Sequence, residues 1–156
     1  MIVDNTSRRK HSEATNVAKF CRNTLRFCRE ELSRRQVHFE LDVDAELVVT
    51  LPHDIVEPAL RWVLVDACDH TPKGETLDIS VLQTSDSVEI EIADARQTVG
   101  QSLRETHDTF MRSPFVMRAL SVGISVETHV CPQGGLARTL VIPLVDEERD
   151  RTRYAA

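Results

Sequence analysis

The amino-acid sequence predicts an α+β domain, a two-layer α/β sandwich in which helices cover one face of a mixed, mostly antiparallel sheet. Segments with the period of a helix alternate along the chain with pairs of segments that have the two-residue period of a strand. Short turns join most of the strand pairs, so hairpins outnumber crossovers. A length of 156 residues suits a single domain with one hydrophobic core.

The composition excludes several other classes of protein. Hydrophobic residues make up 41% and charged residues 28% of the chain, values that are typical of globular domains and not of disordered or low-complexity chains. No run approaches the ~18 consecutive apolar residues that a membrane span needs. The polar amino terminus does not have the pattern of a secretion signal. The expected location is therefore the cytoplasm, without a membrane partner.

The net charge of −6 is distributed unevenly along the chain. Residues 1–35 carry nine Lys and Arg against four Asp and Glu, and the remainder is acidic. We expect the basic segment to be attracted to an acidic partner or to the rest of the chain. An isoelectric point of about 5.5 and an aromatic content of 4% argue against nucleic-acid binding.

The cysteines do not form a metal-binding or redox motif. The sequence contains four of them, and none belongs to a C-x-x-C pair. We therefore expect free thiols that act as small hydrophobic side chains, at Cys21, Cys28, Cys68 and Cys131.

The amino-terminal half predicts two helices with two strands between them. Apolar residues recur at helical spacing from Ser12 to Arg35 and predict one amphipathic helix. Residues 37–43 and 47–51 alternate apolar and polar side chains, as half-buried strands do. Asp54, with Glu57 three residues later, matches a capping box for a second helix, which a proline and a glycine end near residue 72.

The carboxyl-terminal half predicts two hairpins and a short helix. Residues 77–92 form the first hairpin, and Asp94 stands where its second strand stops. Residues 95–112 are polar and are expected to be a mobile connection with at most one short helix. A two-turn helix at 115–120 precedes the last hairpin, at 124–144. The expected divisions are a flexible basic arm at 1–11, the domain at 12–144 and a disordered charged tail at 145–156.

Three segments carry a resemblance to a known superfamily. The helix that starts at Asp54 ends in Asp66-Ala-Cys-Asp-His-Thr-Pro72, which is similar to the N-box pattern Asn-Leu-x-x-Asn-Ala-x-Lys-His/Tyr-Thr-Pro. The hairpin that stops at Asp94 has the position of an Asp-x-Gly-x-Gly motif, and Gly134-Gly135 opens a strand that is similar to the closing Gly-Gly-Thr strand. Over residues 12–144 the chain resembles the histidine-kinase-like (GHKL, Bergerat-fold) ATPases, in particular the ATP-binding domain of bacterial sensor histidine kinases.

The resemblance implies a site for ATP and Mg²⁺. At the family's Asp-x-Gly-x-Gly position, Asp94 would accept a hydrogen bond from the adenine amino group. At the N-box asparagine, Asp66 would hold the metal, since a carboxylate is a good ligand for Mg²⁺. No residue is assigned a catalytic role. The other candidate nucleotide-binding residues are Trp62, at the first N-box asparagine, Asp69, at the lysine, and Arg96 and Thr71.

The departures from the family pattern all fall in this expected site. Of Asp94, Asp66, Trp62 and Asp69, only Asp94 is the expected residue type. Arg96 replaces a glycine that allows close approach of the backbone, so its guanidinium must either fill the adenine pocket or leave it. Between Asp94 and Phe115 the only glycine is Gly100, without the glycine-rich lid segments that cradle phosphates. The apolar framework is intact, which predicts a retained fold with weak or absent binding of ATP and Mg²⁺.

Three hypotheses for the function follow. The first is a degenerate histidine-kinase-like ATPase domain, a pseudokinase, that acts as a regulatory module by contacting a response regulator or a phosphotransfer protein. The second is an active ATP-Mg²⁺-dependent kinase that phosphorylates a His or Ser on another chain. The third is a structural interaction domain whose basic first helix docks on an acidic surface.

Overall fold

The computed structural model describes residues 12–97 and 100–144. The arm at 1–11 and the tail at 145–156 that the sequence predicts lie outside the described residues. The elements in chain order are β1 (Ser12–Asn16), α1 (Val17–Phe27), α2 (Arg29–Arg34), β2 (His38–Asp42), β3 (Val48–Pro52), α3 (His53–His70), β4 (Thr76–Gln83), β5 (Ser87–Asp94), α4 (Gly100–Met111), α5 (Pro114–Ser121), β6 (Ser125–Val130) and β7 (Leu136–Pro143).

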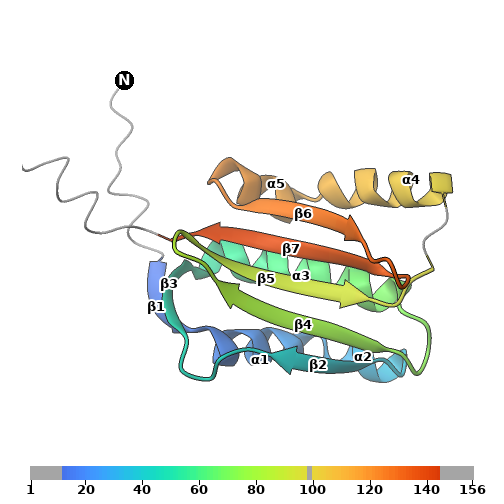
Figure 1. Ribbon diagram of the computed structural model, residues 1–156, viewed down its shortest axis with the longest axis horizontal. Helices are drawn as coiled ribbons and strands as arrows, with labels where there is room; N and C mark the ends of the chain where they lie inside the picture. Colours follow the sequence, from blue (N-terminus) through green and yellow to red (C-terminus); the bar gives the residue numbers. More distant parts are fainter. Residues whose placement is uncertain (1–11, 98–99, 145–156) are drawn as a thin grey trace, which may run out of the picture.

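The architecture is the predicted two-layer α/β sandwich with a mixed sheet (Figure 1). The five strands of the main sheet lie in the order β2-β4-β5-β7-β6, and only β2 and β4 are parallel. Helices α1 and α3 lie behind the strands in Figure 1 and cover one face of the sheet. β5 is the third of five strands, so Asp94 lies at the carboxyl end of the central strand of the sheet.

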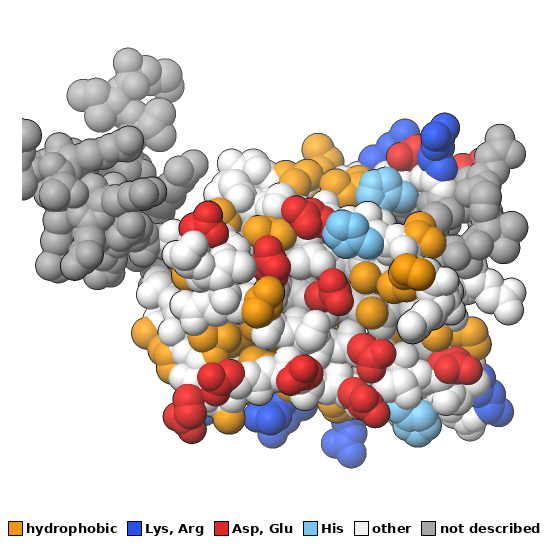
Figure 2. Space-filling view, in the orientation of Figure 1, with side chains coloured by type: hydrophobic (Ala, Val, Ile, Leu, Met, Phe, Trp, Pro, Cys, Tyr) orange, Lys and Arg blue, Asp and Glu red, His pale blue; other side chains and the backbone are white. Residues whose placement is uncertain are grey.

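The opposite face of the sheet is open and acidic. Figure 2 views this face, over which Asp and Glu side chains are spread, whereas the visible Lys and Arg side chains lie mostly at the margins. Acidic residues of the strands contribute to this face, among them Asp78, Glu91 and Glu127. Within the described ranges, no helix is both long enough and apolar enough to span a membrane.

The first segment differs from its prediction. The single helix expected from Ser12 to Arg35 is instead strand β1 followed by two helices, α1 and α2, which meet at Cys28. β1 pairs antiparallel with β3 in a separate two-stranded sheet, a long-range contact that local periodicity does not reveal. The side chain of Asn16 accepts a hydrogen bond from the Lys19 amide and caps α1, which fixes where the strand ends and the helix begins.

The capping box predicted for α3 is also wrong. The N-cap position is held by Pro52, which makes no side-chain hydrogen bond. The Asp54 carboxylate instead accepts a hydrogen bond from Nη2 of Arg118 on α5, at 3.2 Å. An ion pair between two helices has therefore replaced the local contact that the sequence indicated.

The stretch predicted as a connection at 95–112 is largely helical. α4 spans Gly100–Met111, and residues 98–99 lie outside the described residues. The anchor is Phe110, which is 1% exposed and packs on Trp62 of α3 with 6.4 Å between ring centroids. Tertiary packing therefore stabilises a helix whose local sequence signal is weak.

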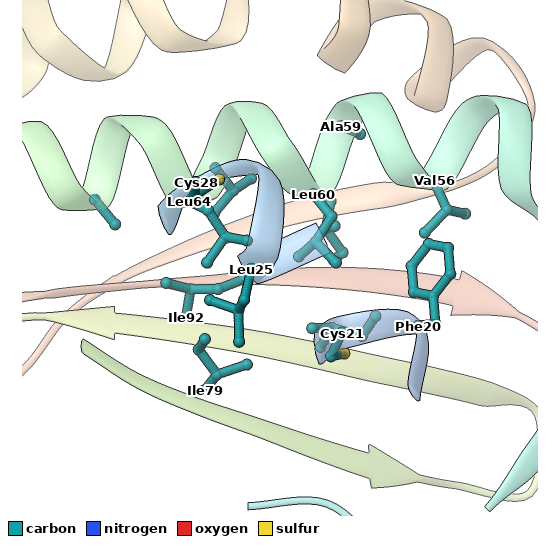
Figure 3. Close-up of a cluster of buried hydrophobic side chains, with 14 of the residues drawn as sticks. Phe20, Cys21, Leu25, Cys28, Val56, Ala59, Leu60, Leu64, Ile79 and Ile92 are labelled. Carbon is teal, nitrogen blue, oxygen red and sulfur yellow. The ribbon is translucent and has the colours of Figure 1, made fainter. Parts of the chain in front are cut away.

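The hydrophobic core lies between the helices and the covered face of the sheet (Figure 3). In this view, side chains from two helices and two strands point toward one another, namely Cys21 and Leu25 of α1, Leu60 and Leu64 of α3, Ile79 of β4 and Ile92 of β5. Removal of this apolar surface from water is the main stabilising contribution to the fold.

The cysteines are free thiols, as predicted. Three of them, Cys21, Cys28 and Cys68, are buried, and Cys131 is partly buried. Burial raises the pKa of the Cys21 thiol from 9.0 to about 12, because the interior disfavours the charged thiolate.

The raised pKa of Cys21 predicts a loss of stability at alkaline pH. The unfolded state ionises this thiol above pH 9.0, whereas the folded state keeps it protonated up to about 12. The contribution of this thiol to stability is therefore complete below pH 9.0 and is lost as the pH rises toward 12. Between these pH values the free energy of unfolding falls as the pH rises, and in Cys21→Ala this fall should be less steep by up to about 1.4 kcal/mol per pH unit. Urea denaturation at a series of pH values measures this slope, and an unchanged slope would contradict the assignment.

The turn between β6 and β7 packs against the end of β5. Gly134 and Gly135 have φ values of +95° and +93°, in the left-handed region that favours glycine. A Cβ atom on Gly135 would overlap the backbone carbonyl oxygen of Asp94, whereas a Cβ on Gly134 would meet nothing within 4 Å. Only Gly135 is therefore required for the close approach of the two backbones.

This contrast predicts different effects of two similar substitutions. Gly134→Ala should destabilise the fold only by its backbone strain, of the order of 1–3 kcal/mol. Gly135→Ala should destabilise it further, because the backbone at Asp94 must move. Urea unfolding curves give the loss of stability in both variants. Equal losses would show that the turn does not approach the backbone of Asp94 closely.

Candidate functional site

The side chain of Asp94 points from β5 toward the side of the sheet that the helices cover. The two-residue period of β5 places it on the same face as Val88, Ile90 and Ile92, which are buried in the core. The Asp94 side chain is 2% exposed. A carboxylate buried to this extent requires a cation or several hydrogen-bond donors close by.

Arg96 binds both carboxylate oxygens of Asp94. Its Nε donates to Oδ1 at 3.0 Å and to Oδ2 at 2.8 Å, and its Nη2 donates to Oδ2 at 2.6 Å. The backbone N–H groups of Arg96 and Leu136 also donate to Oδ1, at 3.0 and 3.3 Å. Each oxygen thus accepts at least two hydrogen bonds, which is the usual capacity of a carboxylate oxygen. As arranged, Asp94 has no free acceptor for an adenine amino group.

Two further residues extend this pair into a buried charge network. Nη2 of Arg96 also donates to Oδ2 of Asp66 on α3, at 2.8 Å, and Nη1 of Arg138 on β7 donates to the same oxygen. The side chains of these four residues, Asp66, Asp94, Arg96 and Arg138, are each 12% exposed or less. The two carboxylates and two guanidiniums balance in charge, which burial requires.

The two guanidiniums are held differently. Burial lowers the pKa of Arg96, but its hydrogen bonds to Asp94 and Asp66 outweigh that effect and leave the pKa above its ordinary value. Burial lowers the pKa of Arg138, and Asp66 only partly offsets this effect, because the positive charge of Arg96 acts in the same direction as burial. Arg96 is therefore the more strongly stabilised cation of the network.

Arg138 connects the network to α4. Its guanidinium carbon lies 3.6 Å from the ring centroid of Phe110, a cation–π contact in a buried setting. The Phe110 ring in turn contacts Trp62. The network thus ends at the aromatic side chains that hold α4 and α5 against α3.

Trp62, a candidate nucleotide-binding residue, contacts aromatic side chains of the helices. Its ring centroid lies 6.4 Å from that of Phe110 and 6.1 Å from that of Phe115. The structure therefore places Trp62 beside the charge network and in the packing between helices.

Two other candidates lie outside the network. The Asp69 carboxylate is 41% exposed and forms an ion pair with Nη2 of Arg35 at 2.9 Å, on the side of α3 that faces α2. Thr71 is buried, and its hydroxyl donates to the carbonyl oxygen of Ala67 at 2.7 Å at the end of α3. The structure thus brings Asp66, Asp94 and Arg96 together but does not bring Asp69 or Thr71 to them.

Sequence reasoning missed Arg138, although a signal for it exists. In β7 the two-residue period places Arg138 in phase with Leu136, Leu140 and Ile142, all of which are buried. A charged residue in the buried phase of a strand is rare unless it is paired. Its register opposite Ile92 of β5 brings it near the network, but this pairing required the structure.

The site as arranged does not fit a bound ATP–Mg²⁺ complex. Asp94 has its acceptors occupied, and two guanidiniums next to Asp66 oppose the approach of a divalent cation. Within 12–97 and 100–144, no group of three or more His, Cys, Asp or Glu is placed to hold a metal ion.

Comparison with known proteins identifies the fold. No protein-family profile and no curated protein matches the sequence. Among solved structures, the catalytic domain of the histidine kinase ThkA matches with a TM-score of 0.70 and 14% identity, over 85% of this chain and 96% of that one. The Acinetobacter baumannii histidine kinase AdeS matches with a TM-score of 0.69 and 17% identity, over 92% of this chain and 72% of that one. The mycobacterial sensor histidine kinase MprB matches with a TM-score of 0.67 and 20% identity, over 85% of this chain and 97% of that one.

These matches define the class of fold, the α+β sandwich of the histidine kinase catalytic domain. The chain has this fold, which confirms the predicted fold and, for the fold, the resemblance.

The network predicts the stability of charge variants. Arg96→Met leaves Asp94 buried without its cation and should destabilise the fold by about 3–5 kcal/mol. The double variant Asp94→Leu/Arg96→Met removes both charges and should recover much of that loss. As a control, Arg34→Met breaks an exposed ion pair with Glu31 and should change little. Urea denaturation measures all three, and a small loss in Arg96→Met would contradict the inferred role of the pair.

Proposed function

We propose that this chain is a pseudokinase module of bacterial signal transduction that has the histidine kinase catalytic fold but does not use ATP. The observation that carries the proposal is the binding of both Asp94 oxygens by Arg96. By the resemblance, Asp94 stands where the family recognises adenine. A side chain of the protein itself occupies the acceptors that the nucleotide would need.

The electrostatics at Asp66 support the same proposal. By the resemblance this carboxylate would hold Mg²⁺, but it accepts hydrogen bonds from Arg96 and Arg138. A metal ion would have to displace at least one guanidinium, and the displaced cation would then lie unpaired in a buried setting. The sequence between Asp94 and Phe115 also lacks the glycine-rich segments that cradle phosphates in the family.

The proposed partner is a protein of two-component signalling in the cytoplasm. One similar structure is the histidine kinase ThkA in complex with the response regulator protein TrrA. It matches with a TM-score of 0.69 and 17% identity, over 88% of this chain and 43% of that one. By analogy, the partner we propose for this chain is a response regulator or a phosphotransfer protein.

A thermal-shift experiment tests the proposal. A ligand at one hundred times its Kd adds about 2.7 kcal/mol to the stability of the folded state, which raises the Tm of a domain of this size by several degrees. We expect no shift in the Tm of this chain with ATP or ADP in the presence of Mg²⁺. The ThkA catalytic domain is measured in parallel under the same conditions. The fluorescence of Trp62, which packs beside the network, is a second readout.

The opposite result would favour the active kinase. A shift of several degrees that Asp94→Asn abolishes would show that ATP binds at the expected place and would overturn the proposal. A shift that survives Asp94→Asn would place nucleotide binding elsewhere and would overturn it as well.

A further inference from the structure

A groove runs between the first two helices and the edge of the main sheet. It is lined by residues of α1, α2 and β2 and has a volume of about 490 Å³. The side chains of Leu25, Leu32 and Val37 form its apolar floor, together with Phe39, which is 46% exposed. A second hollow of about 690 Å³, lined in part by Lys73, shares Leu32 and Val37 with the first, so the groove continues past the end of α2.

The rim of this groove is basic. Arg22 and Arg26 of α1 and Arg29 of α2 line it, at spacings that place them on one side of the helical segment. Neither hollow is lined by an Asp or Glu among the described residues. Among residues 12–97 and 100–144, no ion pair and no side-chain hydrogen bond includes these three arginines.

Local energetics do not account for this cluster. Like charges at such spacings on a helix are mildly destabilising. Arg26 lies in the last turn of α1, where the helix dipole favours a cation, but Arg29 begins α2, where the dipole disfavours one. The chain as a whole is acidic, with a net charge of −6, so this concentration of cations, which have no ion-pair partner among the described residues, is a local feature.

The strand beside the groove also has a free edge. β2 is the first strand of the main sheet, and in the described part of the chain no strand pairs with its outer edge. Its outward backbone N–H and C=O groups therefore lie next to an apolar floor and a basic rim. This combination is typical of surfaces that bind a segment of another protein.

We propose that this groove is the docking site for an acidic segment of a partner protein. Apolar side chains of that segment would pack on Leu25 and Phe39, and its carboxylates would pair with Arg22, Arg26 and Arg29. The inference rests on the proposed function as a protein-binding module and names the surface that does the binding. The mainly aliphatic floor favours a protein over a single-stranded nucleic acid, whose bases stack on aromatic side chains.

A titration with a defined peptide tests the proposal. A labelled synthetic peptide in which Leu alternates with Glu is added to the 156-residue chain, and fluorescence anisotropy gives its Kd. We expect saturable binding that weakens as salt is raised, because salt screens the charge pairs. Peptides with Lys in place of Glu, or Ser in place of Leu, should bind at least about tenfold more weakly.

A matched pair of protein variants locates the site. Arg26→Glu should weaken binding of the acidic peptide about tenfold or more. Arg112→Glu makes the same charge change at an exposed residue between α4 and α5, on the other side of the fold, and should leave the affinity unchanged (Figure 1). Unchanged affinity in Arg26→Glu, equal binding of the Lys peptide, or no saturation with the acidic peptide would overturn the proposal.

Other occupants give distinct results. Stronger binding of a single-stranded oligonucleotide than of the acidic peptide would assign the groove to nucleic acid and overturn the proposal. A tenfold gain in peptide affinity on Asp146→Asn/Glu147→Gln/Glu148→Gln would assign the groove to the chain's own carboxyl-terminal residues and overturn the proposal. A dimer seen by sedimentation that Arg26→Glu dissociates would assign the groove to a second copy and overturn it as well. The nucleotide thermal shift does not involve this groove, so failure here and failure of the proposed function are separate results.

Discussion

The pairing of Asp94 with Arg96 determines how the end of the central strand β5 is joined to α3 and β7. A carboxylate at the end of the central strand, 2% exposed, is strongly unfavourable unless a cation neutralises it. Arg96 is only two residues away and binds it through two nitrogens, and its contact with Asp66 joins the end of β5 to α3. Arg138 then supplies the second positive charge from β7, so three elements meet at one neutral cluster.

This cluster contributes more to specificity than to net stability. A buried ion pair is often no more stabilising than apolar residues of similar volume, because desolvation of the charges offsets their attraction. The cluster does restrict which parts of the chain can pack against one another, however. The Leu136 amide binds Asp94, Gly135 allows the backbones to approach, and Arg138 stacks on Phe110. The register of β7 and the placement of α4 are therefore coupled to the same pair of charges.

Local sequence patterns predict the fold where they are strong and fail where distant contacts decide. α3, the β4–β5 and β6–β7 hairpins and α5 have clear periodicity and lie where it predicts. The strand at 12–16 and the helix at 100–111 depend on β3 and on the packing of Phe110, which no local pattern contains. Motif resemblance predicts that Asp66, Asp94 and Arg96 share a site, but Arg138 joins them through a strand register that only the structure gives.

The distribution of charge favours a protein partner over a nucleotide. At the expected nucleotide site, two arginines are already neutralised by two buried carboxylates, so little net positive charge is left to attract a polyphosphate. Three arginines that have no ion-pair partner within 12–97 and 100–144 lie instead along the groove beside β2, on a molecule whose open sheet face is acidic. An acidic partner would be repelled by most of this surface and attracted at the groove, which would orient it during encounter. The neutralised charges at the expected nucleotide site and the exposed basic groove beside β2 are thus consistent with the proposed function as a protein-binding domain.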